Sequence, residues 1–327
     1  MLFRAPAFVL KFPGILGKST EEYCEIFSNP HLRALVSSTV DPKQNAISLI
    51  YTMATYAGGD NGYPKGGSIT MVGNMLEKAR KLGVELRFRS RVERVRVKDG
   101  RAAGIESNGE FFPADDVIVA ADTVQALDSM FEVPLKEKWI KQLQFFKDPQ
   151  TCTFLSLGVE SGLEDWPEAL RLEPRNRSDI GMDWHGPLMI SVYKGTETGY
   201  APAGCSALTV ILFGNNYDFW KAAKDVGNYK ETKQMVAERV ISIIESELPA
   251  LNGKIKVIDL ATPLTYERYC GNYRGAWMSM WHKGVRPVSV PRTCKTVKGL
   301  HFAGFRTQLS GGLPVALNSG YKAAAGV

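Results

Sequence analysis

The stretch KGLHFAGFRTQLSGGLPVALNSGYKAAAGV, residues 298–327, decides the fold of this chain. Its pattern predicts a strand, a turn, a glycine-rich loop and a helix. A strand that enters a helix through glycines points the free N–H groups and the positive dipole end of that helix at whatever lies in the turn. Pro314 suits the first helical turn, where its missing N–H costs no hydrogen bond. The segment SGGLPVALNSG, residues 310–320, therefore predicts a place where a ligand approaches the backbone closely.

Length and composition indicate an ordinary globular protein. The 327 residues suffice for one large domain or two smaller ones, and 44% hydrophobic with 23% charged residues is typical of soluble proteins. A net charge of +6 is small for this length, so we expect no nucleic acid partner. The 5 cysteines and 4 histidines are scattered without metal-site spacing, and no apolar run reaches the length of a membrane span. We expect a cytoplasmic protein without a metal site.

The first part of the chain predicts short helices and a loop. Ser19 or Thr20 suits the N-cap of a helix that runs through Phe27, with Glu22 completing a capping box. HLRALVSS, residues 31–38, resumes with helical spacing. AGGDNGYPKGG, residues 57–67, is dense in glycine and predicts a loop.

A helix and a run of strands follow this loop. SITMVGNMLEKARKLG, residues 68–83, places Ile69, Val72, Leu76 and Ala79 on one stripe and ends at a glycine. The strands predicted after it are VELRFR (84–89), VERVRV with an Asp-Gly turn (92–100), RAAGIES (101–107) and GEFFPADDVIVAAD (109–122). Their alternating valines and arginines indicate one covered face and one solvated face, a simpler interpretation than a phosphate or membrane patch.

The middle of the chain, residues 135–290, mixes strands with helices. YKETKQMVAERVISIIESELP, residues 229–249, predicts the strongest helix of the chain. Its apolar side holds Met235, Val236, Val240, Ile243, Ile244 and Leu248. Strand-like runs lie at residues 151–160, 186–195, 205–214 and 254–263.

Four stretches together carry a resemblance to a known family. They are GYPKGGSITMVGNMLEKARKLGVELRFRSRVERV (62–95), DDVIVAAD (115–122), TPLTYERYCGNYRGAWMSM (262–280) and HFAGFRTQLSGGLPVALNSGYKAA (301–324). In this order they resemble the phytoene-desaturase and carotenoid-isomerase branch of the flavin oxidoreductases, which are relatives of the amine oxidases. The resemblance covers nearly the whole chain.

The resemblance implies a fold of α/β plus α+β class. A partial FAD-binding domain of the glutathione-reductase type would be interleaved with a substrate domain built on a mixed sheet. The helical part of the substrate domain would hold residues 1–58, and its main part residues 126–290. The FAD domain would hold residues 59–125, a helix with a three-stranded meander, and residues 291–327, the last strand and helix.

One departure from the family matters for the cofactor. The family opens with a strand–GxGxxG–helix that binds the FAD pyrophosphate, and this sequence has no such motif. We therefore expect a truncated Rossmann domain whose first βαβ unit, about 100–200 residues, is missing. The alternative is that a separate chain supplies this nucleotide-binding segment. Without parallel partners, the strands at 117–121 and 300–304 would expose apolar edges.

The resemblance also implies which residues contact FAD. Gly66 and Gly67 would pass beside the cofactor, Val92 would lie near the adenine, and Gly304 with Phe305 would turn beneath the flavin. The helix start at Gly311, Gly312, Leu313 and Pro314 would stabilise negative charge on the reduced flavin. Phe305 stands where many relatives carry an acidic or amide side chain. Because the flavin carries the chemistry, no catalytic side chain is expected.

Each of these positions also has a plainer interpretation. Gly66 and Gly67 could end a loop before a helix, Val92 could be a core strand residue, and Gly311 with Gly312 could form an ordinary helix entry. For the substrate, Tyr269, Tyr273, Trp277 and Met278 suggest an apolar aromatic wall suited to a polyene. Their alternative is a place in the core of a strand and a turn.

The function that the resemblance implies is FAD-dependent desaturation, saturation or isomerisation of a small apolar substrate, carotenoid- or isoprenoid-like. Two alternatives stay open. One is a flavin amine oxidase, although TPLTYERYCGNYRGAW (262–277) looks closer to the desaturase branch. The other is a non-catalytic fragment that cannot hold FAD alone. The apolar residues 1–17 are a candidate surface for peripheral contact with a bilayer.

Overall fold

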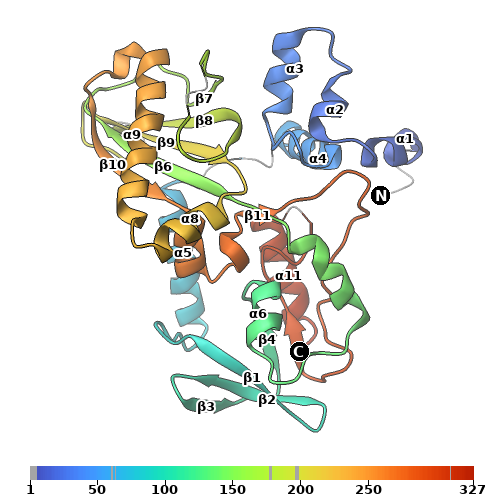
Figure 1. Cartoon of the computed structure of the whole chain (residues 1–327). Coiled ribbons are helices and arrows are strands. Elements are labelled where there is room, and N and C mark those ends of the chain that lie inside the picture. Colours follow the sequence, from blue (N-terminus) through green and yellow to red (C-terminus); the bar gives the residue numbers. More distant parts are fainter. Residues whose placement is uncertain (1–5, 60–61, 63, 177–178, 196–198, 310) are drawn as a thin grey trace. The chain divides into compact units, whose positions relative to one another are not determined.

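The computed structural model describes residues 6–59, 62, 64–176, 179–195, 199–309 and 311–327 (Figure 1). The chain forms two compact units. The first unit holds residues 1–62, 150–269 and 282–284, and the second holds residues 63–149, 270–281 and 285–327. Each unit is thus assembled from segments that lie far apart in the sequence. The domain boundaries expected at residues 58, 125 and 290 stay predictions.

An antiparallel sheet of five strands forms the centre of the first unit, in the order β10-β6-β9-β8-β7. The strands are β6 (Cys152–Val159), β7 (Ala169–Leu172), β8 (His185–Lys194), β9 (Ser206–Phe213) and β10 (Ile255–Ala261). The prediction of a mixed sheet is wrong for these strands. β7, β8 and β9 follow one another through loops, and strands joined in this way pair antiparallel because a parallel pair needs a crossover connection.

Helix α9 (Tyr229–Glu247) packs against this sheet, as its apolar periodicity predicts (Figure 1). Val236, Val240 and Ile244 are fully buried in one core with the inward side chains of β6, β8 and β9. Trp220 of α8 (Tyr217–Asp225) joins the same core and donates a hydrogen bond from its ring N–H to Thr153 Oγ1 at 3.2 Å. The remaining helical elements here are η3 (Pro249–Leu251) and α10 (Pro263–Cys270), which ends where the second unit resumes.

Four helices precede the sheet in this unit. They are α1 (Pro6–Leu16), α2 (Thr20–Cys24), α3 (Pro30–Ser37) and α4 (Ala46–Ala57). The predicted capping box is confirmed: the Ser19 N–H donates to Glu22 Oε2 at 2.8 Å, and the Glu22 N–H donates to Ser19 Oγ at 3.2 Å. Helix α2 ends at Cys24, three residues before the predicted Phe27. Asn29 and Asn45 accept backbone N–H groups as N-caps of α3 and α4.

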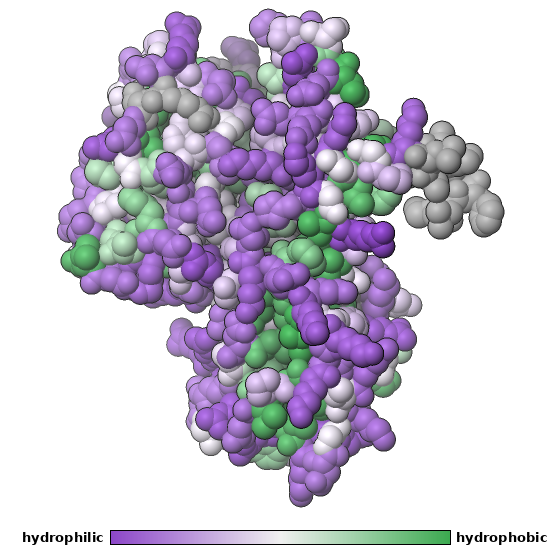
Figure 2. Space-filling view, turned by 45° about the vertical axis from the view of Figure 1, so that its right-hand side comes forward, coloured by the Kyte–Doolittle hydropathy of each residue, from purple (hydrophilic) through white to green (hydrophobic). Residues whose placement is uncertain are grey.

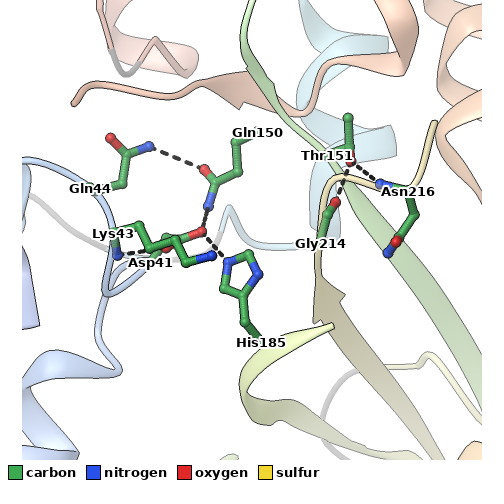
Figure 3. A network of polar contacts seen from close by, with 8 residues as sticks. All are labelled: Asp41, Lys43, Gln44, Gln150, Thr151, His185, Gly214 and Asn216. Carbon is green, nitrogen blue, oxygen red and sulfur yellow. Dashed lines mark hydrogen bonds and ion pairs between the residues drawn. The ribbon is translucent and has the colours of Figure 1, made fainter. Parts of the chain in front are cut away.

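A buried polar network joins the α3–α4 loop to the sheet within the first unit (Figure 3). Asp41 Oδ2 accepts hydrogen bonds from Gln150 Nε2 at 2.8 Å and His185 Nε2 at 2.9 Å, and its Oδ1 accepts the Lys43 N–H at 2.8 Å. The Asp41 side chain is completely buried. Burial raises the pKa of this carboxyl, but the hydrogen bond and charge of His185, with the other two donors, outweigh burial and lower the pKa overall.

The second unit contains the predicted three-stranded meander, β1 (Val92–Lys98), β2 (Arg101–Ser107) and β3 (Glu110–Pro113). β1 and β2 pair antiparallel up to Lys98 and Arg101, so Asp99 and Gly100 form a two-residue turn. Both have positive φ angles, 49° and 74°, which is the geometry that an Asp-Gly hairpin turn favours. The predicted Asp-Gly turn is therefore confirmed.

A short parallel pair, β4 (Val117–Val119) and β12 (Leu300–Phe302), forms the centre of the second unit. Phe302 is almost completely buried and packs edge-on against the Trp139 ring, with ring centroids 5.4 Å apart. The remaining elements of this unit are α5 (Gly67–Lys81), α6 (Thr123–Ser129), η2 (Lys138–Phe146), η4 (Tyr273–Gly275), β11 (Met278–Ser279) and α11 (Leu313–Ala324). Strand β5 (Pro149–Gln150) lies where the chain passes from one unit to the other.

Residues 84–89 do not form the predicted strand, and this prediction is wrong. Arg89 has a φ of 57°, in the left-handed region that a strand residue does not adopt. Arg87 binds Glu85 Oε1 at 2.7 Å and stacks its guanidinium over the Phe112 ring at 4.4 Å. The alternation of arginines and apolar residues here reflects local contacts rather than strand pairing.

Helix α5 begins one residue before the predicted Ser68 and ends at Lys81, two residues before Gly83, and it leaves part of its apolar stripe uncovered. Ile69 and Val72 are 81% and 47% exposed, and Met75 beside them is 52% exposed. In the segment that follows, Val84 and Phe88 are 50% and 63% exposed. Figure 2 shows apolar surface among hydrophilic side chains in the lower part of the view, which holds the meander. The second unit therefore carries more apolar surface than a covered domain would.

Candidate functional site

The carboxyl ends of β4 and β12 define the candidate site. Val119 O accepts the Ala303 N–H at 3.0 Å, so both strands end side by side before Ala120 and Gly304. In α/β folds, ligands bind outside the carboxyl ends of parallel strands. The predicted FAD residues of the C-terminal segment follow directly at this edge.

Gly304 lies tightly against the end of β4. Its φ of 128° is unfavourable for other residues, and a Cβ atom there would lie 3.3 Å from Ala120 O. The Gly304 N–H donates to Ser319 Oγ of α11 at 3.0 Å, while Thr307 Oγ1 donates to Gly304 O at 2.9 Å. The start of the turn after β12 is thus fixed at Gly304 by two side-chain hydroxyls.

The glycine loop leaves the N-terminus of α11 open. Gly311 has a φ of 87°, and a Cβ atom there would lie 2.5 Å from Phe305 O. Gly312, with a φ of 101°, is the N-cap of α11, and no side chain among the described residues caps this end of the helix. Its own N–H donates to Phe305 O at 3.1 Å. Leu313 and Pro314 form the exposed first turn, as predicted, while position 310 of the quoted loop lies outside the described residues.

Val92 shares a cavity of about 390 Å³ with the end of β4. The cavity is lined by Val92 and Ile105 of the meander, by Phe112, and by Ala120 with Ala121 after β4. Because Gly304 packs against Ala120 O, the structure brings Val92, Gly304 and the α11 loop around one strand end. Phe305 is half-buried and its carbonyl, rather than its side chain, supports the glycine loop.

A buried ion pair that the sequence did not predict lies beneath this edge. Arg306 and Asp122 pair through Nη1 and Oδ2, and their side chains are 2% and 0% exposed. Arg306 also donates from Nε to Ser279 Oγ at 3.1 Å and from Nη2 to Phe146 O. Asp122 in addition caps α6, since its Oδ1 accepts the N–H groups of the two residues after Thr123. The available signal was a charged residue within four positions of the end of each strand, Asp122 after β4 and Arg306 after β12.

Gly66 and Gly67 begin α5, and their backbone geometry alone explains why these positions are glycine. Their φ angles are 79° and 77°, and a Cβ atom on Gly66 would lie 2.6 Å from Thr70 Oγ1. The Thr70 hydroxyl donates to Gly66 O at 2.7 Å. The loop interpretation accounts for both residues, and their contact with a cofactor stays a prediction.

The predicted aromatic wall is divided between the two units. Tyr273, Trp277 and Met278 are half-buried in the second unit. Tyr269 belongs to the first unit, where it is 75% exposed on α10 with the Arg268 guanidinium 5.2 Å from its ring. The alternative of a core strand is wrong for Tyr269, because α10 is helical there.

The chain's own atoms at this edge fit a flavin. The N-terminus of α11 offers N–H donors to an anionic or electron-rich edge of a flavin. In the described residues, no cluster of three or more His, Cys, Asp or Glu side chains could hold a metal ion. No described helix is both long and apolar enough to cross a membrane.

Comparisons with known proteins identify the family of this chain. A profile described as "Flavin containing amine oxidoreductase" matches residues 30–327. The 4,4'-diapolycopene oxygenase of Methylomonas is 25% identical over 274 residues, which cover 79% of this chain and 53% of that protein. The chloroplastic prolycopene isomerase of Daucus carota is 27% identical over 303 residues, 86% of this chain and 46% of that protein. The chain spans about half the length of the curated relatives it matches.

Solved structures share the fold. An oxidoreductase from Methanosarcina mazei aligns with a TM-score of 0.61 and 15% identity over 96% of this chain and 71% of that one. Cyclohexylamine oxidase from Brevibacterium oxydans aligns with a TM-score of 0.57 and 16% identity over 96% of this chain and 68% of that one. The resemblance to phytoene desaturase-like proteins is confirmed, and FAD is the cofactor class. The chain belongs to the flavin containing amine oxidoreductases, a family of FAD-dependent oxidoreductases.

Proposed function

We propose that this chain is the substrate-binding and flavin-edge part of an FAD-dependent oxidoreductase acting on carbon–carbon bonds of an apolar, carotenoid- or isoprenoid-like substrate. The observation that carries the proposal is the uncapped N-terminus of α11 beside the carboxyl ends of β4 and β12. Relatives named 4,4'-diapolycopene oxygenase, prolycopene isomerase and all-trans-zeta-carotene desaturase support the polyene class.

FAD bound at this edge would supply hydride transfer, and the chain's residues would position it. The N–H groups of the first turn of α11, after Gly311 and Gly312, would stabilise negative charge on the adjacent ring edge. Gly304 would allow close passage of the ring, and Val92 would border the adenine end. Tyr273, Trp277 and Met278 would form an apolar surface that excludes water from the substrate. No side chain of the chain needs to act as nucleophile or general base.

The uncovered stripe of α5 supports the proposal that a separate chain supplies a nucleotide-binding βαβ segment. Ile69, Val72 and Met75 form an apolar face, and Val84 and Phe88 extend it along an unpaired segment. Ile118 of β4 is 41% exposed, so this strand also offers apolar surface. A βαβ segment offers a strand that could pair beside β4 and a helix that could pack against the apolar face of α5.

Anaerobic reduction of the flavin tests the proposed function. The purified chain is mixed with FAD, freed of unbound cofactor and titrated with a detergent-solubilised carotenoid or, separately, with cyclohexylamine. Bleaching of the visible flavin band by the carotenoid alone is the expected result. Bleaching by the amine alone would establish the amine oxidase alternative. Absence of retained flavin would establish a fragment that cannot hold FAD without its partner.

A further inference from the structure

A second cavity lies along strand β1 of the meander. It measures about 750 Å³ and is lined by β1, by Gly100 of the β1–β2 turn, by two residues of β2 and one of β3, and by the segments 131–136 and 296–297. Neighbouring residues along a strand point to opposite faces of the sheet. Ile105 and Phe112 line the cavity that reaches Val92, whereas Glu106 and Phe111 line this one. The two cavities share Val95 of β1, and the rest of their linings differs.

The wall of this cavity is apolar and accessible. Val97, Phe111 and Val133 are 43%, 48% and 70% exposed, although all three line one hollow. Pro134 and Leu135 continue the wall. Apolar side chains that gather in a concave, accessible surface mark a binding site more often than scattered ones do.

A glycine and a set of backbone hydrogen bonds hold the residues of this wall in place. Gly104 of β2 has a φ of 143°, and a Cβ atom there would lie 2.9 Å from the Phe111 ring and would clash with Phe112 O. Only glycine at this position allows the Phe111 ring to lie across β2. On the other side, the Glu137 carboxylate accepts the N–H groups of Lys295 and Thr296, each at 2.7 Å. These bonds hold the segments 131–136 and 296–297 together.

The rim of the cavity carries excess positive charge. Four cationic and two acidic side chains line it. Arg96 forms ion pairs with both acidic side chains, with Glu106 at 2.8 Å and with Glu132 at 3.1 Å. Among the described residues, the other three cations have no ion-pair partner; they are Arg94, Lys98 and Lys136. The rim is thus suited to an anion that the protein itself does not supply.

We propose that this cavity binds a single-chain amphiphile, whose apolar chain lies along Val97, Phe111 and Val133 and whose anionic phosphate or carboxylate head meets Arg94 and Lys136. The volume lies within the range of about 300–1,000 Å³ that small-molecule sites occupy. A free inorganic anion would leave the apolar wall unused, and an uncharged lipid would leave the three cations without a partner.

Titration calorimetry with dodecyl phosphate, kept below the concentration at which it forms micelles, tests this proposal. We expect saturable binding of one molecule per chain, with no binding of inorganic phosphate or dodecyl maltoside at the same concentrations. The variant Arg94→Gln/Lys136→Gln should bind about tenfold more weakly, because it loses two charge-assisted contacts. Phe111→Ser should weaken binding because it removes part of the apolar wall while leaving every charge of the rim unchanged.

The matched control removes two charges elsewhere. Lys230→Gln/Lys254→Gln changes two exposed lysines of the first unit and should bind like the wild type. Equal weakening by both double variants would overturn the proposal, since it would reveal a net-charge effect. Binding of inorganic phosphate as tightly as dodecyl phosphate would overturn the role of the wall. If the chain binds anionic phospholipid vesicles but not the monomeric amphiphile, the proposed site is wrong and these residues contact a membrane surface instead.

Discussion

Replacing Arg306 by methionine tests the buried ion pair beneath the candidate site. The substitution leaves the Asp122 carboxylate, whose side chain is 0% exposed, without its cationic partner. It also removes donors to Ser279 Oγ and Phe146 O. Breaking a buried pair by removing one partner costs about 3–5 kcal/mol, because an uncompensated charge stays buried. We therefore expect the free energy of unfolding of Arg306→Met to fall by about 3–5 kcal/mol, a large share of the stability of a typical domain.

A double variant separates the charge from the packing. Asp122→Asn removes the charge, yet its side-chain oxygen still accepts the N–H groups of Val124 and Gln125, since asparagine is a good N-cap. Arg306→Met/Asp122→Asn should therefore recover more than half of the stability that the single variant loses. Urea unfolding at pH 7, followed by tryptophan fluorescence, measures all three proteins.

Two results would refute the reasoning. If Arg306→Met lost less than about 1 kcal/mol, the pair would behave like an exposed surface salt bridge. If the double variant were no more stable than the single one, the loss would come from packing and not from the unpaired carboxylate.

Three further predictions follow from local geometry. Gly311→Val should lower stability by about 1–3 kcal/mol, because a φ of 87° and the nearby Phe305 carbonyl disfavour a side chain; thermal unfolding at the wild-type midpoint would contradict this. Asp41→Asn should destabilise at pH 7. The folded pKa of Asp41 is lowered, so its charge stabilises the fold above the unfolded pKa of about 3.9. That stability is lost as the pH falls through the folded pKa, so the urea midpoints of variant and wild type should converge as the pH falls below about 3.9. A difference between the midpoints that stays constant with pH would argue against it. Burial, partly offset by a hydrogen bond with Tyr266, raises the pKa of Cys152 to about 12, so its thiol stays protonated at pH 8. Iodoacetamide at pH 8 should therefore label exposed Cys270 first, as peptide mass spectrometry would report, whereas equal labelling of both cysteines would show that Cys152 is accessible.

The sequence predicted those features that short-range physics determines. The Ser19–Glu22 capping box, the Asp99–Gly100 turn and helix α9 are confirmed, because each depends on residues within a few positions or on one repeating apolar face. The order strand, glycine loop and helix at the C-terminus is confirmed for the same reason.

Features that depend on distant partners could not be predicted in this way. Residues 84–89 alternate as a strand does, but strand formation needs a neighbouring strand to pair with, and Arg89 turns the chain instead. The antiparallel order of the five-stranded sheet depends on which strands meet after folding. Arg306 and Asp122 are 184 residues apart, so nothing local in the sequence pairs them.

Hydrogen–deuterium exchange with and without excess FAD tests the central claim most directly, because it reports both binding and its place in the chain. We expect FAD to slow exchange at the N–H groups of residues 311–313, 315, 316 and 119–122, in the start of α11 and the end of β4, with no such effect in Gly311→Val. Exchange that FAD leaves unchanged in both segments, or slows only elsewhere in the chain, would contradict the assignment of this edge as the flavin site.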